Sequence, residues 1–213
     1  MLTANSKYEY SNFYQIGPTN IIQEEKMVYQ KGQEILRCQP FTYIVDHEFR
    51  SIVCDYCLKL NESNSKPLKK CSACQIVYYC GNRCQKKAWK SHHQRECKGL
   101  KNISPNLLFN HDLHVMRIIL KLQNGGDREF VELPNGKRRY FRDLMSHHKE
   151  ISQSEKMHAF QSVILVLKLC LDEKNLPEKS NEVLEIYGKM VINSFEIQDN
   201  SMTEGIGQGL YLG

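Results

Sequence analysis

The chain has 213 residues, of which 41% are hydrophobic, and a formal net charge of +5 at neutral pH. That length and apolar content suffice for one medium-sized domain or two small ones, each with its own core. The longest apolar run, residues 163–171, is much shorter than the ~20 residues of a membrane-spanning helix, and the first residues lack the apolar segment of a signal peptide. We therefore expect no membrane association and a location in the nucleus, the cytoplasm or both.

The first fifty residues favour strands and turns. Two short runs, residues 34–38 and 41–45, are rich in β-prone side chains, and Gly32 and Pro40 interrupt them. A polar loop at residues 61–67 separates the first two cysteine pairs described below and is too hydrophilic to pack in a core.

After Cys97 the pattern becomes helical. Residues 105–123 carry apolar side chains on one face and are followed by Asn124 and two glycines, which predicts a helix and its end. An amphipathic piece follows at residues 140–145. Ser152 and Glu155 form a capping-box pattern ahead of a helix that ends near Leu171.

The last forty residues predict one more helix and a strand. Ser180 can cap a helix over residues 181–192, and residues 195–197 favour a strand. The glycine pattern of residues 205–213, GIGQGLYLG, is found in dinucleotide-binding loops, but only between a strand and a helix. No helix follows here, so we expect no dinucleotide site.

Cysteine usage is the most informative feature. Seven of the nine cysteines lie between Cys54 and Cys97. Without a secretory signal the compartment is expected to be reducing, where clustered thiols are typical of metal sites rather than disulfides. Cys38 and Cys170 stand apart from this cluster and are expected to be small buried hydrophobic residues.

The spacing of the cluster predicts two zinc ions. Its members form four pairs: Cys54 with Cys57, Cys71 with Cys74, Cys80 with Cys84, and His93 with Cys97. Each pair can supply half of a tetrahedral site, with zinc–sulfur bonds of about 2.3 Å. His93 and Cys97 are four residues apart and share a helix face, whereas His92 lies about 100° further round. His93 is the predicted ligand and His92 the alternative. Spacing alone leaves open whether the pairs combine in sequence or interleave.

The cluster resembles the MYND zinc finger. The resemblance rests on residues 54–57 (CDYC), 71–74 (CSAC), 79–80 (YC), 84–89 (CQKKAW) and 93–97 (HQREC). In that family the first pair combines with the third and the second with the fourth. The resemblance therefore implies one ion held by Cys54, Cys57, Cys80 and Cys84, and another held by Cys71, Cys74, His93 and Cys97. This chain has one more residue between Cys84 and its histidine than the family usually shows, which keeps His92 as the alternative.

Two structural zinc ions are the expected cofactors. Four protein ligands leave no position for a reactive water, and in so small a module the metal supplies folding free energy, ~10 kcal/mol or more per ion. Fingers of this family can recognise proline-rich peptides. Trp89 is therefore expected either to contribute to such a surface or to pack against the neighbouring domain.

The flanking segments are similar to the SET and MYND domain (SMYD) family of protein-lysine methyltransferases. Residues 31–41 resemble the strand that enters the finger in that family, and residues 192–195 and 207–211 resemble the segment that leads into its catalytic core. The resemblance implies an α+β fold, in which a small two-zinc finger is inserted in an incomplete β-rich SET fold with a helical insertion. The expected domains are 1–53 for the first strands of the SET fold, 54–97 for the finger, 98–193 for the helical insertion and 194–213 for the start of the SET core.

The catalytic elements implied by the resemblance are harder to find. Intact relatives transfer a methyl group from S-adenosylmethionine to a lysine amine. The glycine-rich loop of the family would fall at residues 21–25, which contain no glycine, and residues 138–148 do not supply recognisable cofactor contacts. The Asn-His-Ser-Cys motif and the catalytic tyrosine would lie beyond Tyr211. We therefore assign no catalytic residue and do not expect S-adenosylmethionine binding.

The leading hypothesis is a zinc-binding protein that mediates protein–protein interaction, related to chromatin or transcription. The alternative hypothesis is an S-adenosylmethionine-dependent protein-lysine (histone) methyltransferase, as in intact relatives. A third hypothesis is nucleic-acid binding, because ten Lys or Arg residues against one acid lie between Lys66 and Lys101. The basic stretch lacks the interleaved aromatic residues that stack on bases, so a solvent-exposed basic face is the simpler interpretation.

Overall fold

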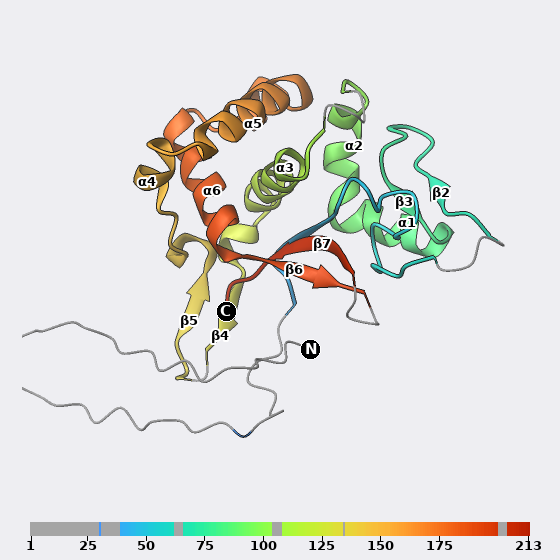
Figure 1. Ribbon diagram of the computed structural model, residues 1–213, viewed down its shortest axis with the longest axis horizontal. Helices are drawn as coiled ribbons and strands as arrows, with labels where there is room; N and C mark the ends of the chain where they lie inside the picture. Colours follow the sequence, from blue (N-terminus) through green and yellow to red (C-terminus); the bar gives the residue numbers. More distant parts are fainter. Residues whose placement is uncertain (1–29, 31–38, 62–65, 104–107, 134, 200–203) are drawn as a thin grey trace, which may run out of the picture. The chain divides into compact units, whose positions relative to one another are not determined.

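The computed structural model describes residues 30, 39–61, 66–103, 108–133, 135–199 and 204–213. Contacts divide the chain into residues 1–38 and 39–213, and the helices and strands described below all belong to the second unit (Figure 1). The predicted strand at residues 34–38, Cys38 and the expected position of the glycine-rich loop at residues 21–25 lie outside the described residues.

A three-stranded antiparallel sheet joins the two ends of the second unit. Strand β7 (Gly205–Leu210) lies in the centre, between β1 (Thr42–Val45) and β6 (Ser194–Gln198). In register, Thr42 is opposite Leu210 and Val45 is opposite Gly207. The glycine pattern near the C-terminus is therefore a central strand and not a loop. An added Cβ at Gly207 would lie 2.3 Å from the carbonyl oxygen of Ile44, so this close approach requires glycine.

Helix α3 (Asn110–Gln123) is the central helix of the unit. One side of α3 packs against β1. Its other sides pack against α5 (Lys156–Cys170) and α6 (Ser180–Asn193), as Figure 1 shows. The helix starts later than the predicted residue 105, because Leu108 and Phe109 are not helical and residues 104–107 are not described. The carboxylate of buried Asp112 accepts a hydrogen bond from the backbone N–H of Phe109 at 3.1 Å, which fixes the start of the helix.

The segment between α3 and α6 differs in part from the prediction. After the 3-10 turn η3 (Gly126–Arg128), β4 (Phe130–Glu132) and β5 (Arg138–Tyr140) form a hairpin, and η4 (Phe141–Asp143) follows. Ser152 does not cap α5. It is the last residue of α4 (His148–Ser152), and its hydroxyl donates to the Lys149 carbonyl at 2.6 Å. A local hydrogen bond within α4 therefore replaces the predicted cap.

The C-terminal elements agree with the prediction more closely. Helix α5 ends at Cys170, after which the 3-10 turn η5 (Glu173–Asn175) leads to α6 and then to β6. Ser180 is the first residue of α6 rather than its cap, because Lys179 occupies the N-cap position, without a side-chain capping bond. Cys170 is buried in the core, as predicted. Most buried apolar side chains form one core, which runs from the helices to the cysteine-rich segment. Helices and strands of this kind confirm the α+β class.

The cysteine-rich segment consists of short elements that follow β1. Strands β2 (Lys69–Lys70) and β3 (Tyr78–Tyr79) form a hairpin, and α1 (Asn82–Ala88), the π-helical turn η1 (Trp89–His93) and α2 (Gln94–Leu100) follow as one continuous helical run. These short elements contain few backbone hydrogen bonds, so interactions other than secondary structure must stabilise much of the segment.

Candidate metal centres

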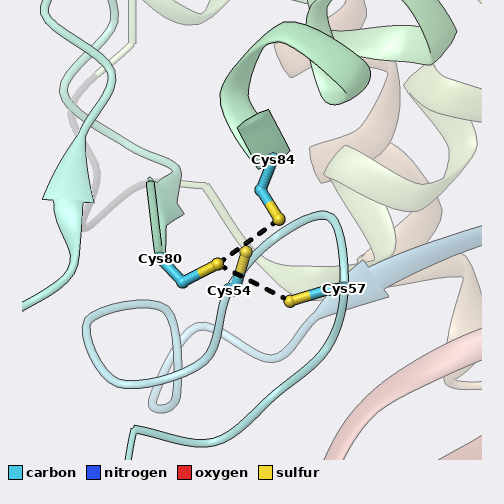
Figure 2. A group of neighbouring side chains, drawn as sticks. All are labelled: Cys54, Cys57, Cys80 and Cys84. Atoms are coloured by element: carbon cyan, nitrogen blue, oxygen red, sulfur yellow. Dashed lines mark hydrogen bonds between the residues drawn. The ribbon is translucent and has the colours of Figure 1, made fainter. Parts of the chain in front are cut away.

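The first group of predicted ligands comes together at one point. The sulfur atoms of Cys54, Cys57, Cys80 and Cys84, here called the four-cysteine centre, all lie within 4.8 Å of one another. Figure 2 shows them pointing inward from a loop, from the end of β3 and from α1. The Sγ atoms of Cys57 and Cys80 are 3.8 Å apart, and those of Cys80 and Cys84 are 3.3 Å apart. A tetrahedral zinc with bonds of ~2.3 Å has sulfur–sulfur edges of ~3.8 Å, so the group fits this ion.

The second group has three sulfurs and one imidazole nitrogen. The ligand atoms of Cys71, Cys74, His93 and Cys97, here called the cysteine–histidine centre, also lie within 4.8 Å of one another, and all four side chains are buried. The Sγ atoms of Cys71 and Cys97 are 3.8 Å apart, and Nε2 of His93 is 3.7 Å from Sγ of Cys74. These separations also match the edges of a tetrahedral zinc site, in which the zinc–nitrogen bond is ~2.0 Å. The structure thus brings the pairs together in the interleaved order.

Two similar turns present the Cys-x2-Cys pairs. In each, the backbone N–H of the residue after the second cysteine donates to the carbonyl of the first cysteine: Leu58 to Cys54 at 2.9 Å, and Gln75 to Cys71 at 3.0 Å. Both of these residues have a left-handed backbone, with φ of 56° and 62°. Such a conformation costs a non-glycine residue roughly 1–2 kcal/mol. The two turns therefore store strain that other interactions of the finger must offset.

The π-helical turn orients the two histidines differently. In η1 the N–H of Gln94 donates to the carbonyl of Trp89, five residues earlier, and a turn of this kind adds one residue to an α-helix. It accommodates the additional residue that the sequence shows before the histidine. His93 faces Cys74, whereas Nε2 of His92 points elsewhere and lies 3.1 Å from Oδ2 of Asp55. The geometry favours His93 over His92 as a ligand.

The electrostatics of the cysteine–histidine centre favour positive charge at its middle. Burial alone would lower the pKa of His93, but hydrogen bonds with Cys74 and Glu96 outweigh it and raise that pKa to about 11. Burial and the neighbouring thiols of Cys74 and Cys71 raise the pKa of Cys97 to about 12. A proton on each ligand group reduces the repulsion between neighbouring thiolates. A divalent cation at the centre would reduce the same repulsion for all of the ligands at once.

A buried polar cluster between the two centres was missed by sequence reasoning. Asp55 lies between Cys54 and Cys57, Glu96 precedes Cys97, and both contact Arg117 of α3. Oxygen and nitrogen atoms of Asp55, His92 and Glu96 lie within 4.8 Å of one another, which by itself suggests a third cation site. The guanidinium of Arg117 already neutralises the two carboxylates. An acid beside a predicted ligand was visible in the sequence, but nothing there indicated that an arginine of a later helix would pair with it.

Both predicted groups are closed sites. Each has four protein donors, so neither leaves a position at which a metal could activate water. The finger thus holds two structural zinc ions, one bound by four cysteines and the other by three cysteines and a histidine.

The side chain of Trp89 is the main apolar feature that the finger leaves accessible. It is 41% exposed, and its ring meets the His93 ring edge-on at a centroid distance of 5.9 Å. Three other apolar residues of the finger, Ile76, Val77 and Tyr79, are almost fully buried, and Tyr78 is partly buried. They form the interior of the finger. Of the two roles expected for Trp89, this exposure favours a contribution to an interaction surface over packing against the neighbouring domain.

Comparison with known proteins identifies the cysteine-rich segment first. Residues 54–97 match the family model of the MYND finger, the same bounds that the ligand spacing gives. No helix in the described part of the chain is long and apolar enough to cross a membrane.

The similarity to known proteins extends beyond the finger. The chain is 33% identical over 184 residues to the histone-lysine N-methyltransferase SMYD3 of Homo sapiens, covering 84% of this chain and 40% of that protein. It is 30% identical over 206 residues to the histone-lysine N-methyltransferase ASHR1 of Arabidopsis thaliana, covering 90% of this chain and 40% of that protein. It is 23% identical over 181 residues to the N-lysine methyltransferase SMYD2-B of Danio rerio, covering 82% of this chain and 38% of that protein. The chain thus spans about 40% of the length of these relatives.

Proposed function

The chain belongs to the SET and MYND domain (SMYD) family, and on that premise we propose that it is a zinc-dependent protein-interaction module that acts on chromatin-related partners. The observation that carries the proposal is the pair of closed four-ligand groups, which form a rigid finger with an accessible aromatic side chain. The link to chromatin is supported by the relatives, which are named as histone-lysine methyltransferases. The expected location is the nucleus, the cytoplasm or both.

The proposal assigns the ligands residue by residue. One zinc is bound by Cys54, Cys57, Cys80 and Cys84, and the other by Cys71, Cys74, His93 and Cys97. Support comes from the separations of their sulfur and nitrogen atoms, which match the edges of a zinc tetrahedron.

The histidine assignment has a direct test. His93→Ala should lower the tightly bound zinc from two equivalents to one, whereas His92→Ala should retain both. Zinc is counted by elemental analysis after dialysis against a weak chelator. The reverse outcome, loss of zinc only in His92→Ala, would refute the assignment.

The domain organisation follows the same proposal. Residues 1–53 supply the first strands of a SET fold, 54–97 the finger, 98–193 the helical insertion and 194–213 the start of the SET core. The antiparallel pairing of β1 with β7, from opposite ends of the described unit, supports a finger and helices inserted between strands of one sheet.

The proposed partner surface of the finger centres on Trp89. Aromatic side chains that are open to solvent are typical docking sites for proline-rich peptides, which already have the extended conformation they need for binding. Lys86 and Lys90 are exposed on either side of Trp89 in the sequence, so acidic residues beside the prolines should strengthen binding.

A peptide-binding experiment tests this surface. The full chain is titrated with a library of proline-rich peptides by fluorescence anisotropy, in parallel with Trp89→Ala and with the control Leu165→Ala. Leu165 is also exposed, at 60%, but it lies on α5. Binding that Trp89→Ala reduces at least tenfold and Leu165→Ala leaves unchanged would support the proposal. Binding that both variants keep would contradict it.

A second candidate function is transfer of a methyl group from S-adenosylmethionine to a protein lysine. It is favoured by the similarity to named lysine methyltransferases over more than 80% of this chain. Residues 138–148, where such relatives are expected to contact the cofactor, form β5, η4 and the start of α4. Calorimetric titration of the chain with S-adenosylmethionine decides between the two functions. Micromolar binding would favour the enzyme, and no heat of binding would favour the interaction module.

A further inference from the structure

Arg117 is a buried cation at the centre of the described unit. Its side chain is only 3% exposed. The guanidinium donates from Nε to Oε2 of Glu96 at 2.8 Å, from Nη2 to both carboxylate oxygens of Asp55 at 2.9 and 3.0 Å, and from Nη1 to the carbonyl of Tyr43 at 2.8 Å. All three of its nitrogens are therefore used, and the side chain is held in a single orientation.

The two carboxylates connect Arg117 to different metal centres. Asp55 lies within the Cys54–Cys57 turn, and its backbone N–H donates to the carbonyl of Tyr78 in β3. Glu96 precedes Cys97, and its Oε1 lies 3.0 Å from Nδ1 of His93. One side chain of α3 thus contacts Asp55 in the loop of the four-cysteine centre and, through Glu96, is linked to the histidine of the cysteine–histidine centre.

The contact with Glu96 determines how the His93 ring can bind a metal. When Nδ1 of His93 carries the proton, it donates a hydrogen bond to Glu96. The lone pair of Nε2 then faces Sγ of Cys74. A carboxylate in this position is the usual support of a metal-binding histidine. Glu96 itself is fully buried, and only a neighbouring cation allows it to remain charged there. The Arg117 guanidinium supplies that cation, with its Nε 2.8 Å from Oε2 of Glu96.

We propose that Arg117 is a positioning residue for both zinc centres, and that through Glu96 it holds His93 in the tautomer and orientation that the cysteine–histidine centre requires. The inference rests on the ligand assignment proposed above. It extends the metal-binding unit beyond residues 54–97 to a residue of α3, so zinc retention by the finger depends on the helical segment that follows it.

The test uses the full chain with Arg117→Met and, as a matched control, Arg128→Met, because the side chain of Arg128 is 85% exposed. Zinc release to a colorimetric chelator is followed in time, and the two centres are distinguished by ¹¹³Cd NMR of the cadmium-substituted protein. Loss of an outer support typically weakens metal binding 10- to 100-fold. Arg117→Met should accelerate release by about this factor, more from the cysteine–histidine centre than from the four-cysteine centre, and should shift the cadmium resonance of the former. Arg128→Met should change neither.

A double variant separates positioning from general stability. In Arg117→Met with Glu96→Gln, the glutamine can still accept from Nδ1 of His93 but no longer needs a buried cation. Zinc retention should recover at least in part compared with Arg117→Met alone. If Arg117 serves only the packing of α3, the second substitution should add to the damage instead.

Several outcomes would overturn the inference. One is a folded Arg117→Met protein with the zinc release rates and cadmium resonances of the wild type. Another is a double variant that is no better than the single one. Should Arg117→Met fail to fold, a folded two-zinc protein recovered by adding Glu96→Gln would support the inference, and continued failure would contradict it. A wild-type chain that binds fewer than two zinc ions would instead refute the ligand assignment on which the inference rests.

Discussion

The contact between the finger and the helical segment can be tested at Gly99. This residue belongs to α2, and an added Cβ would lie 2.0 Å from the carbonyl oxygen of Cys170, at the end of α5. It would also lie 2.7 Å from the carbonyl carbon of that residue. Because the obstructing atoms are backbone atoms, no side-chain rotation can relieve the clash, and the two helices must separate by about 1 Å.

The cost of Gly99→Ala follows from two opposing effects. Overpacking of a well-packed site typically costs ~1–3 kcal/mol, and a backbone clash falls at the upper end of that range. Alanine recovers up to ~1 kcal/mol of helix propensity relative to glycine. The net destabilisation should be about 2 kcal/mol, which lowers the Tm of a chain of this size by about 4–8 °C.

Circular dichroism at 222 nm measures this effect during thermal unfolding in the presence of zinc. The control is Lys98→Ala, one residue earlier in α2, where the side chain is 82% exposed and pairs with Asp172, which is itself 56% exposed. Surface pairs of this kind contribute little, so the control should melt close to the wild type. A Gly99→Ala protein that melts within about 2 °C of the Lys98→Ala control would refute the argument that α2 and α5 are in rigid backbone contact.

Three further predictions concern metal, pH and helix capping. Removal of zinc with a strong chelator should abolish hydrogen-exchange protection in residues 54–97 while α5 and α6 keep theirs; unchanged protection of the finger would show that metal does not hold it. Burial and the nearby Arg117 lower the pKa of His114 from its ordinary value of 6.5 to about 3, so only the unfolded state gains a proton as the pH falls below 6.5, and stability decreases. Between pH 7 and 5.5 the wild type should lose about 1 kcal/mol more than His114→Gln in urea unfolding, and parallel losses would contradict this. Asp112→Ala removes the acceptor at the start of α3 and should cost about 1 kcal/mol or more, whereas Asp112→Asn should cost less; equal melting of the two variants would argue against the capping role.

The metal-binding pattern could be predicted because it is local. Two cysteines separated by two residues can bind one ion within a single turn, whatever the rest of the chain does. The four pairs, the two zinc ions and the bounds of the finger were therefore visible in the sequence. The choice between interleaved and sequential pairing was not, and it came from the resemblance to the MYND finger.

The helix boundaries show where local patterns fail. Ser152 and Glu155 match a capping box, but the chain forms α4 up to Ser152, and the Ser152 hydroxyl bonds within that helix instead. The glycine pattern of residues 205–210 was not expected to form a dinucleotide-binding loop, but it did not predict a strand either; these residues form the central strand β7, where the backbone of β1 approaches too closely for a side chain at Gly207. The first difference comes from a local hydrogen bond, and the second depends on a strand partner that is distant in the sequence.

The sequence by itself determined which residues can bind zinc and how many ions they can hold, since these depend on covalent spacing and on the chemistry of thiols and imidazoles. Tertiary structure decided the rest. The spacing of His93 and Cys97 already predicted His93 as the ligand, but the π-helical turn that directs His93, not His92, toward Cys74 is visible only in the structure. Arg117 meets Asp55 and Glu96 only because α3 packs beside the finger. Buried charges need partners wherever the fold can bring them, and that requirement leaves no mark in the sequence near the charges themselves.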